Sequence, residues 1–479
     1  MGERLLEILT VSQTYAADKE TIAKIVPEFN LMENAAFALV CEITKRIKKA
    51  PVFVLCGNGN NGGDGFAAAR LLERRGWPVE VVMTAPPAGL KGAALKHASL
   101  WKGKTSYLTP SLPERIRSRK GVIIDAMFGI GLNRPLPDDV SDFVRKANAM
   151  ELPFIAVDLP SGVKADTGEI AGDAPKCLFS VTFGRPKPAH FLYPAKERCG
   201  ETVVCPIGIP DDVIVRQKPF LFVNGTELFT LPEPDAGSHK YSRGGVLICG
   251  GEKMTGAARL SARAARRAGA GWVAVAANAS SAGFYTQDAA ENVVFPLNRD
   301  SDFDDLAVSG KVRSIVIGPG NGVTQETERR LKTTARSGKP FVADADALAF
   351  VRNVDLKNAV LTPHAGEFYR LFPDLKSSDK ISAALQAAER LNAVVVFKGA
   401  DTVVASPAGI AAIQDRTSFE LSVAGSGDVL AGIAGTMLAK GLPPFQAACA
   451  AVFLHSAAGI AAGRNIIASD IIDCLKPIP

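Results

Sequence analysis

The chain has no paired cysteines and no block of like charge. Its eight cysteines form no C-x-x-C pair and no even framework, which argues against a disulfide scaffold and favours reduced thiols in a cytoplasmic protein. The 55 basic and 49 acidic residues give a formal charge of +6, and the two signs are interspersed. A nucleic-acid ligand calls for a clustered basic face, so we expect no nucleic-acid partner.

Long hydrophobic runs are also missing. No stretch of about 18 uncharged apolar residues stands out, which is the length that a membrane-spanning helix needs. Residues 1–11 lack the basic start and apolar middle of a secretion signal. We therefore expect no membrane partner, no secretion through a signal peptide, and a cytoplasmic location.

The chain does have enough sequence for two globular domains. Its 479 residues exceed the roughly 250 to 300 residues at which a single hydrophobic core stops growing. Short apolar runs alternate with helix-like segments, which is the pattern of βα units around a parallel sheet. No repeat of solenoid period is visible, so we predict two different α/β domains fused in one chain.

In the first domain we predict strands at 51–56, 79–83, 121–125 and 153–158, and helices at 31–48 and 66–75. The pattern degrades between residues 207 and 233, and we place the domain boundary near residue 216. An Ala-rich segment from Asp428 onward predicts packed helices. In the second domain we predict strands at 246–250, 272–276, 314–317, 340–343, 359–362 and 394–398.

A glycine-rich turn, GNGNNGGDG, follows the first predicted strand. Gly57, Gly59 and Gly62 have the G-x-G-x-x-G spacing that lets a helix N-terminus approach a pyrophosphate, although this spacing alone is a weak signal. An ordinary NAD-dependent oxidoreductase also needs an acid about 20 residues further on, where this chain has Met83 and Thr84. The sequence disfavours that class while allowing a dinucleotide ligand.

Polar residues follow three of the predicted strands in the first domain. Amides and a carboxylate, from Asn58 to Asp64, follow the first strand, Asp125 ends the third, and Asp158 ends the fourth and precedes Ser161. Ligands of open α/β sheets bind beyond the carboxyl ends of the strands, so we expect these residues to converge on one site. The alternative is that Asp125 and Asp158 only cap turns.

The second domain carries the sequence GSGD, which ends at Asp428 beside a predicted helix. Glycines and helix N–H groups form an anion hole for a phosphoryl group, and Asp428 is placed to take a proton from an attacking hydroxyl. The alternative is a turn whose acid is favoured by the helix dipole. Lys398 and Gly399, at an upstream strand end, favour phosphoryl transfer, and His364 follows another strand.

The motifs GNGNNGGDGFAAAR, DAMFGIGLNRPL and VDLPSGVKADTG, with LMENAA before them, resemble the NAD(P)H-hydrate epimerase family over residues 1–215. The resemblance implies a Rossmann-like three-layer sandwich. It also implies an isomerase activity that interconverts the R and S forms of hydrated NADH and NADPH. It implies catalysis by Asp158 and a potassium ion held by Asn61, Asp125 and Ser161. The substrate contacts that it implies are Asn60, Asn61, Gly62, Gly63, Asp64, Gly129, Ile130, Gly131, Leu132, Asn133, Arg134, Pro135 and Asp158.

The motifs IGPGNG, ADADAL, LTPHAGEF, FKGADT and GSGDVLAG resemble the NAD(P)H-hydrate dehydratase family, which we assign to residues 216–479. The resemblance implies a ribokinase-like three-layer sandwich. It also implies a lyase activity in which Asp428 is the catalytic base. It implies hydrate contacts at Ala257, Gly320, His364 and Asp428. The nucleotide contacts that it implies are Lys398, Gly399, Ala400, Asp401, Thr402 and Gly427.

The two resemblances together imply repair of the hydrates NADHX and NADPHX. The fused arrangement resembles bacterial and archaeal members that use ADP, so we expect ADP as cosubstrate, AMP and phosphate as products, and Mg²⁺ at the phosphates. We also expect a homo-oligomer. The family pattern is broken by Ala189 and near Lys240, so the sequence assigns no role to Lys187 and no catalytic role to Lys240.

Two alternatives stay open at this stage. The second domain can instead be a kinase of a small alcohol, which would release a stable phosphorylated product. The first domain can instead be a binding module without catalysis, against which Asn61, Asp125, Asp158 and Ser161 argue.

Overall fold

A computed structural model describes residues 7–86, 89–233, 235–291 and 293–476. The chain divides into two compact units, Met1–Phe220 and Leu221–Pro479. Each unit is an α/β domain with its own sheet. The expectation about a secretion signal rests in part on residues 1–6, which lie outside the described residues.

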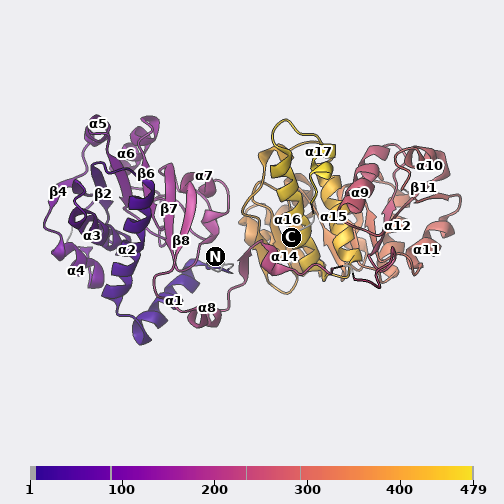
Figure 1. The fold of residues 1–479 in the computed structure, drawn as a ribbon, viewed down its shortest axis with the longest axis horizontal. Helices are drawn as coiled ribbons and strands as arrows, with labels where there is room; N and C mark the ends of the chain where they lie inside the picture. The colour runs from indigo at the N-terminus through magenta and orange to yellow at the C-terminus, as the bar shows by residue number, and fades with distance from the viewer. Residues whose placement is uncertain (1–6, 87–88, 234, 292, 477–479) are drawn as a thin grey trace. The chain divides into compact units, whose positions relative to one another are not determined.

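The first unit contains a 7-stranded parallel sheet in the order β4-β3-β2-β5-β6-β7-β8 (Figure 1). Successive strands lie to one side of β2 and then to the other, which opens a crevice beyond the carboxyl ends of β2 and β5. The strands are β2 Val52–Cys56, β3 Val79–Met83, β4 Lys104–Tyr107, β5 Val122–Ala126, β6 Phe154–Val157, β7 Cys177–Phe183 and β8 Glu201–Cys205.

Helices cover both faces of this sheet and give the predicted three layers. One core joins the sheet to α2, α3 and α4, and the other joins it to α5 and α6. The helices are α1 Val11–Lys24, α2 Glu28–Arg46, α3 Asn60–Arg74, α4 Gly92–Leu100, α5 Leu112–Ser118, α6 Asp138–Ala149, α7 Ala195–Cys199 and α8 Asp211–Arg216.

Helix α3 corrects the sequence prediction. We expected a glycine-rich turn followed by a helix from residue 66, but α3 begins at Asn60 with Gly59 as its N-cap. The low helix propensity of Asn and Gly hid its first turn, which packing against the sheet stabilises. Asn60, Asn61 and Asp64 are therefore held by a helix, whereas Asn58 lies in the loop before it.

The second unit contains a larger sheet, whose strands run in the order β9-β18-β17-β16-β15-β14-β13-β10-β11-β12. The six predicted strands are present, and all are parallel. The antiparallel run from β16 through β17 to β18 was not predicted, because these strands are too short for a clear pattern. The strands are β9 Leu221–Val223, β10 Gly245–Cys249, β11 Trp272–Asn278, β12 Val293–Leu297, β13 Ser314–Ile317, β14 Phe341–Ala343, β15 Ala359–Leu361, β16 Val394–Phe397, β17 Val403–Ala405 and β18 Ala411–Ile413.

Helices also cover both faces of the second sheet. Helices α9, α15, α16 and α17 share one core with the sheet, in which Val396 of β16 takes part. The next residue, Phe397, points to the other face, where it stacks on Phe368 of α13 and lies under Lys380 of α14. The helices are α9 Thr255–Arg267, α10 Ala279–Thr286, α11 Asp300–Val308, α12 Gln325–Arg336, α13 Ala365–Leu371, α14 Lys380–Leu391, α15 Ser426–Ala439, α16 Pro444–Ala462 and α17 Ala468–Asp473.

Helix α16 corrects the expectation that no segment is long and apolar enough to cross a membrane. By length and composition α16 qualifies, and polar residues such as Gln446 and His455 hid it from the scan for apolar runs. However, 61% of the helix window is buried inside the fold, and α16 packs against α15 and α17. Its apolar character is explained by its place in the core.

Candidate active sites

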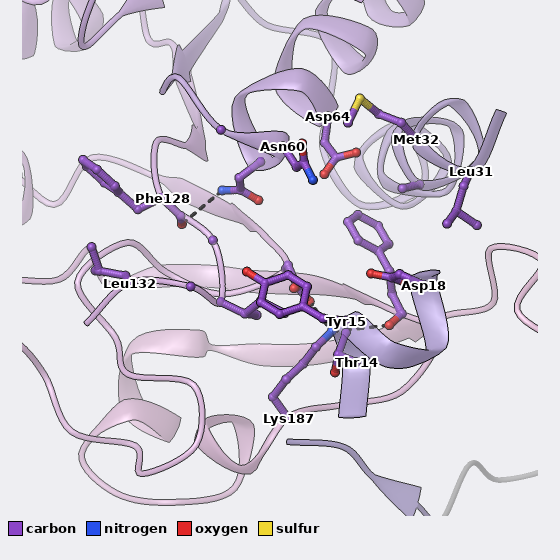
Figure 2. Close-up of a pocket in the computed structure, with 18 of the residues that line it drawn as sticks. Thr14, Tyr15, Asp18, Leu31, Met32, Asn60, Asp64, Phe128, Leu132 and Lys187 are labelled. Carbon is purple, nitrogen blue, oxygen red and sulfur yellow. Dashed lines mark hydrogen bonds and ion pairs between the residues drawn. The ribbon is translucent and has the colours of Figure 1, made fainter. Parts of the chain in front are cut away.

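A cavity of about 1000 Å³ opens in the first unit beyond β2, β5 and β6 (Figure 2). Helix α1 contributes Tyr15 and Asp18 to its wall, which no motif had marked. Gly62, Gly63 and Pro135 do not line it, although the resemblance had placed them at the substrate. The residues on the wall that the sequence did predict are Asn60, Asn61, Asp64, Gly129, Ile130, Gly131, Leu132, Asn133, Arg134 and Asp158.

Gly62 and Gly63 serve packing. A Cβ on Gly62 would lie 2.0 Å from the carbonyl oxygen of Gly57, and a Cβ on Gly63 would lie 2.7 Å from Ala94 and from the Sδ of Met32. Both contacts are too close for any side chain. The two glycines therefore let the first turn of α3 press against the end of β2 and against α2 and α4.

Asn61, Asp125 and Ser161 meet around the backbone of Phe128. The Ser161 hydroxyl and N–H donate to Asp125 at 2.6 and 2.7 Å, and the Asn61 amide donates to the Phe128 carbonyl oxygen at 3.1 Å. The Phe128 N–H in turn donates to Ser161 Oγ at 2.9 Å. Two strand ends and one helix turn thus bring carboxylate, amide, hydroxyl and carbonyl oxygens together.

Asp125 is a fully buried carboxyl without a basic partner among the described residues. Burial raises its pKa to about 6, although hydrogen bonds from Ser161 and Met127 act in the opposite direction. A charge buried in this way is costly unless a counter-ion compensates it. The oxygen-rich surroundings therefore fit a hard monovalent cation.

Asp158 follows β6 with a φ of +64°, a left-handed conformation that is uncommon for a residue with a side chain. Its Oδ1 accepts hydrogen bonds from Lys187 Nζ at 2.7 Å and from Thr182 Oγ1 at 2.6 Å. Burial pushes the pKa of Asp158 upward, but the charge of Lys187 and these hydrogen bonds outweigh it and hold the pKa below its ordinary value. Lys187, to which the sequence assigned no role, lines the same cavity.

Two other carboxyls on the wall of this cavity have raised pKa values. Burial, offset in part by Lys187, raises the pKa of Asp18 to about 6. Burial and then the charge of Asp158 raise the pKa of Asp64 well above its ordinary value. Figure 2 shows Asp18 and Asp64 on different sides of the cavity. The pKa values of Asp18 and Asp64 are thus raised while that of Asp158 is lowered. Carboxyls whose pKa values differ in this way are typical of sites where one group acts as an acid and another as a base.

A second cavity, of about 780 Å³, lies within the second unit. Ala257, Gly320 and Asp401 do not line it, although the resemblance had placed them at ligands. Ala257 and Gly320 adjoin each other, and Asp401 is bonded to Lys380 of α14. The predicted residues on its wall are His364, Lys398, Gly399, Ala400, Thr402, Gly427 and Asp428.

The predicted anion hole is the first turn of α15. The helix begins at Ser426, with Gly425 as an N-cap in the left-handed conformation at φ +89°, so Ser426 and Gly427 lie inside the helix rather than before it. A Cβ on Gly427 would lie 3.2 Å from Lys398 Nζ and 3.8 Å from Asp344 Oδ2. A cation and a carboxylate thus stand beside the first turn of α15.

Asp428 lies on this first turn, and its pKa is raised to about 6. Burial is the main cause and the charge of Asp344 the next, while Lys398 acts in the opposite direction. Lys398 Nζ donates to Asp344 Oδ1 at 3.2 Å. A carboxyl with a pKa near neutrality is suited to general-base work. Asp344 stands in the motif ADADAL, but its position beside the predicted base was not evident from sequence.

Two histidines have distinct places around this cavity. Ser426 Oγ lies 3.0 Å from His455 Nε2, and burial lowers the pKa of His455 to about 4, so its ring is neutral at pH 7. A lone histidine in the apolar helix α16 gave no sequence signal for this contact. His364 Nδ1 accepts from the N–H groups of Gly366 and Glu367, so His364 caps α13 as well as lining the cavity.

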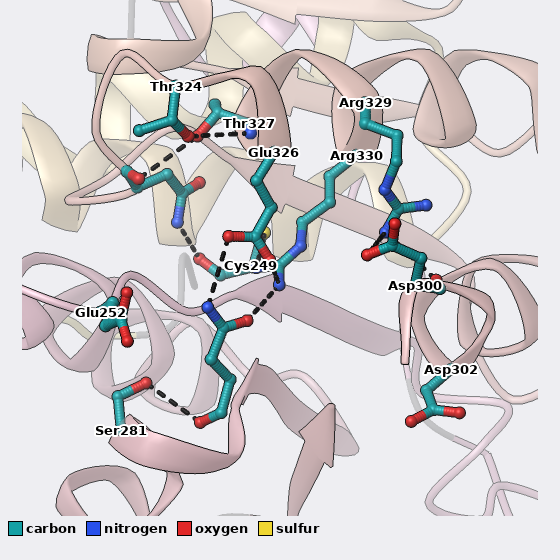
Figure 3. Close-up of polar contacts among 12 residues, drawn as sticks. Cys249, Glu252, Ser281, Asp300, Asp302, Thr324, Glu326, Thr327, Arg329 and Arg330 are labelled. Atoms are coloured by element: carbon teal, nitrogen blue, oxygen red, sulfur yellow. Dashed lines mark hydrogen bonds and ion pairs between the residues drawn. The ribbon is translucent and has the colours of Figure 1, made fainter. Parts of the chain in front are cut away.

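A buried arginine ties together the strand ends that flank Gly320. Arg330 of α12 hydrogen-bonds to Asn278 at the end of β11 and to Glu326, and its Nη1 lies 3.7 Å from Cys249 Sγ at the end of β10 (Figure 3). Asn321 adds a hydrogen bond of 2.8 Å to the Cys249 carbonyl oxygen. Because β10 is where the strand order changes direction, this network fixes the switch-point loops.

The described residues contain no cluster of three or more His, Cys, Asp or Glu side chains arranged to hold a metal ion. A divalent ion in the second cavity would therefore depend on one or two carboxylates together with phosphate oxygens, which is the usual coordination of Mg²⁺ at nucleotides. Asp344, Glu367 and Asp428 are the carboxylates on its wall, and Asp344 and Asp428 are the two that lie beside the first turn of α15.

Comparison with known proteins gives matches in both units. Residues 28–189 match the family described as YjeF-related protein N-terminus, and residues 246–476 match the family described as NAD(P)H-hydrate dehydratase. A solved structure of the ADP/ATP-dependent NAD(P)H-hydrate dehydratase from Bacillus subtilis is 28% identical, with a TM-score of 0.45, and covers 51% of this chain and 92% of its own.

Full-length relatives carry both parts. The bifunctional NAD(P)H-hydrate repair enzyme of Thermofilum pendens is 34% identical, covering 95% of this chain and 91% of the relative. The enzyme of the same name in Escherichia coli is 33% identical, covering 89% of this chain and 84% of the relative. The chain therefore belongs to the family of bifunctional NAD(P)H-hydrate repair enzymes.

Proposed function

We propose that the protein repairs hydrated NADH and NADPH in two steps. The first domain, residues 1–215, interconverts the R and S hydrates, and the second, residues 216–479, dehydrates the S hydrate at the expense of ADP. Family membership and the two separate cavities support this division of labour. The observation that carries it is the paired chemistry: an ionised Asp158 in one cavity, and a base of pKa about 6, Asp428, at a helix N-terminus in the other.

In the first cavity, Asp158 manages the proton movement that accompanies loss and return of water at the hydroxyl-bearing ring carbon. Residues 60–64 and 129–135 form the substrate-binding segments. Those on the wall contact the hydrate, while Gly62 and Gly63 shape the turn. A potassium ion held by Asn61, Asp125 and Ser161 would supply a fixed positive charge beside the dinucleotide.

In the second cavity, Asp428 accepts the proton of the ring hydroxyl, whose oxygen attacks the terminal phosphorus of ADP and displaces AMP. Phosphorylation turns hydroxide into a good leaving group. Phosphate then departs with both electrons of the carbon–oxygen bond, and the neighbouring ring carbon loses a proton, which restores the dihydropyridine. The first turn of α15 and Lys398 are suited to hold the transferred phosphoryl group.

For the nucleotide we propose contacts from residues 398–402 and Gly427, and for the hydrate contacts from His364, Asp428, Ala257 and Gly320. Of these residues, Asp401, Ala257 and Gly320 would have to act from outside the cavity wall. A Mg²⁺ ion, held by phosphate oxygens with Asp344 or Asp428, would neutralise charge on the phosphates. The negative charge of Asp344 helps to raise the pKa of Asp428. A Mg²⁺ ion between the two carboxyls would reduce the repulsion between their charges.

We also assign the protein to the cytoplasm as a homo-oligomer. The eight cysteines are all free, which supports a reducing compartment.

The direct test is to incubate chemically hydrated NADH with the protein, ADP and Mg²⁺ and to follow recovery of reduced-nicotinamide absorbance, AMP and phosphate. Formation of reduced dinucleotide, AMP and phosphate in equal amounts supports the proposal. A stable phosphorylated product would indicate a small-alcohol kinase instead, and no recovery would refute the repair function.

A further inference from the structure

A buried lysine on the wall of the first cavity and a buried histidine next to it have so far no role in the proposed reaction. Lys187 is 1% exposed and yet lines the cavity, and His190 is 1% exposed beside it. Both follow β7, on the segment whose departure from the family pattern obscured them in the sequence. A buried charged side chain is costly to keep, so its partners indicate what it does.

All three donors of the Lys187 ammonium have acceptors. Nζ donates to Asp158 Oδ1 at 2.7 Å, to Thr182 Oγ1 at 3.0 Å and to the Phe183 carbonyl oxygen at 3.4 Å. The Thr182 hydroxyl donates its own hydrogen bond to Asp158 Oδ1 at 2.6 Å. Every hydrogen bond that the described residues make to this carboxylate reaches Oδ1, which leaves Oδ2 available to a ligand.

His190 connects the backbones of the two charged residues. Its Nε2 lies 3.0 Å from the Asp158 carbonyl oxygen, which can only accept, so Nε2 carries a proton. Burial, and then the charge of Lys187, lower the pKa of His190 to about 4, so the ring is neutral. Its Nδ1 therefore accepts from the Lys187 N–H at 3.0 Å.

The strained backbone of Asp158 is fixed at both of its polar groups. The Asp158 N–H donates to the Val181 carbonyl oxygen at 2.8 Å, and the carbonyl oxygen accepts from His190. A left-handed conformation of a non-glycine residue is strained and persists only where its surroundings impose it. Here the imposed conformation aims the carboxylate at Lys187 on one side and at the cavity on the other.

We propose that Lys187 and His190 are positioning residues of the epimerase: Lys187 keeps the Asp158 carboxylate an anion in a buried cavity, and His190 locks the two residues together. The proposal rests on the epimerase function assigned above. Asp158 acts on the hydrate through Oδ2, and neither partner needs to touch the reacting carbon.

Other titratable groups also face this pair. Tyr15 and Asp18 come from α1, Asp64 from α3 and Cys199 from α7. Besides burial, the charge of Asp158 raises the pKa of each of these groups, which shows how close they lie to its carboxylate. Burial acts against the Asp158 anion, and the charge of Lys187 is the main group that favours it, so removing that charge raises the pKa of Asp158.

The experiment measures R-to-S interconversion of purified hydrate as a function of pH, with the spontaneous rate subtracted, for the full-length protein and its variants. For Lys187→Met we expect the acid limb of kcat to move to higher pH, with about a tenfold loss below the limb for each unit of displacement. His190→Gln keeps the ammonium, so kcat falls at every pH while the limb stays in place. Lys164→Met, which removes a surface lysine paired with Glu169, should match the parent.

An acid limb of Lys187→Met that coincides with the parent limb would overturn the role of Lys187, and an unchanged kcat in His190→Gln would overturn that of His190. Should Lys187→Met fail to fold, Lys187→Ala with added methylammonium returns an amine to the vacated space. Activity that rises with methylammonium supports the proposal, and no response contradicts it. If the parent itself does not interconvert the hydrates, the epimerase function fails instead.

Discussion

At the scale of single residues, both cavities place a lysine beside a buried carboxyl, with opposite consequences. Lys187 contacts Asp158 directly and holds its pKa low. Lys398 contacts Asp344 instead, so Asp428 feels burial and a neighbouring negative charge, and its pKa rises to about 6. The same residue types thus yield a permanent anion in one cavity and a titrating base in the other.

The rate of dehydration should therefore depend on pH through Asp428. The base must be ionised to accept a proton, so activity is expected to fall as the pH drops through about 6. Asp344→Asn removes the neighbouring negative charge, which lowers the pKa of Asp428 and moves the acid limb of kcat to lower pH. The measurement is a pH–rate profile on purified S hydrate, and a limb that stays or moves upward in Asp344→Asn contradicts this electrostatic account.

Potassium should stabilise the first domain through Asp125. A cation that binds only the folded state adds about 2.7 kcal/mol at 100 times its dissociation constant. At about 2–4 °C per kcal/mol for a domain of this size, we expect a rise of several degrees in the unfolding temperature. Replacing sodium by potassium in thermal unfolding checks this, with Asp125→Asn as the variant that should lose the effect. Equal unfolding temperatures in the two salts would argue against the site.

At the scale of elements, the first turn of α3 decides the shape of the epimerase cavity. Gly62→Ala would force a Cβ to within 2.0 Å of the Gly57 carbonyl oxygen, whereas Gly59→Ala meets nothing within 4 Å. Overpacking of this kind costs about 1–3 kcal/mol. We expect Gly62→Ala to lower the unfolding temperature of the first domain and Gly59→Ala to leave it almost unchanged, as calorimetry can measure. Similar effects of the two substitutions would contradict this explanation.

The sequence was informative about elements wherever hydrophobic pattern decides structure. The buried strands β2, β3, β5 and β6 and the six parallel strands of the second unit were predicted, because each is a short and mostly apolar segment, although β3 contains Glu80 and β5 contains Asp125. The start of α3 was missed, since Asn60–Gly63 are poor helix formers that packing holds in place. The short strands β17 and β18 were missed for lack of length.

The candidate sites divide in the same way. Motifs located Asp158 and Asp428, because glycines and polar residues beside a strand end mark a turn with chemistry. They did not locate Lys187, His190 or Asp344, whose roles depend on distances between segments that only folding brings together. Partners of this kind carry no local pattern that a sequence scan can detect.

At the scale of the whole molecule, the two units are separate folds with separate cavities. The boundary predicted near residue 216 and the division after Phe220 both fall beyond the last strand of the first sheet. No residue of one cavity belongs to the other. Each step of the repair can therefore be removed without the other.

The dehydratase should prefer ADP to ATP. The terminal phosphate must reach the first turn of α15 while the rest of the nucleotide is held near residues 398–402. One extra phosphoryl group would push the reacting phosphorus past the helix N-terminus, and a misplacement of about 1 Å can cost about 100-fold in rate. Comparison of kcat/KM for the two nucleotides, each freed of the other, on the same S hydrate checks this. A value for ATP equal to or above that for ADP would refute the preference.

The most direct test of the two-step account follows both epimers at once. R and S hydrates are separated by chromatography during incubation with ADP and Mg²⁺, and the parent should consume both and return the reduced dinucleotide. Asp158→Ala should consume S and leave R at its spontaneous rate. Asp428→Asn should still interconvert the epimers while losing dehydration by about 10²- to 10⁴-fold. Equal clearance of R and S by Asp158→Ala, or dehydration by Asp428→Asn above about a tenth of the parent rate, would contradict the account.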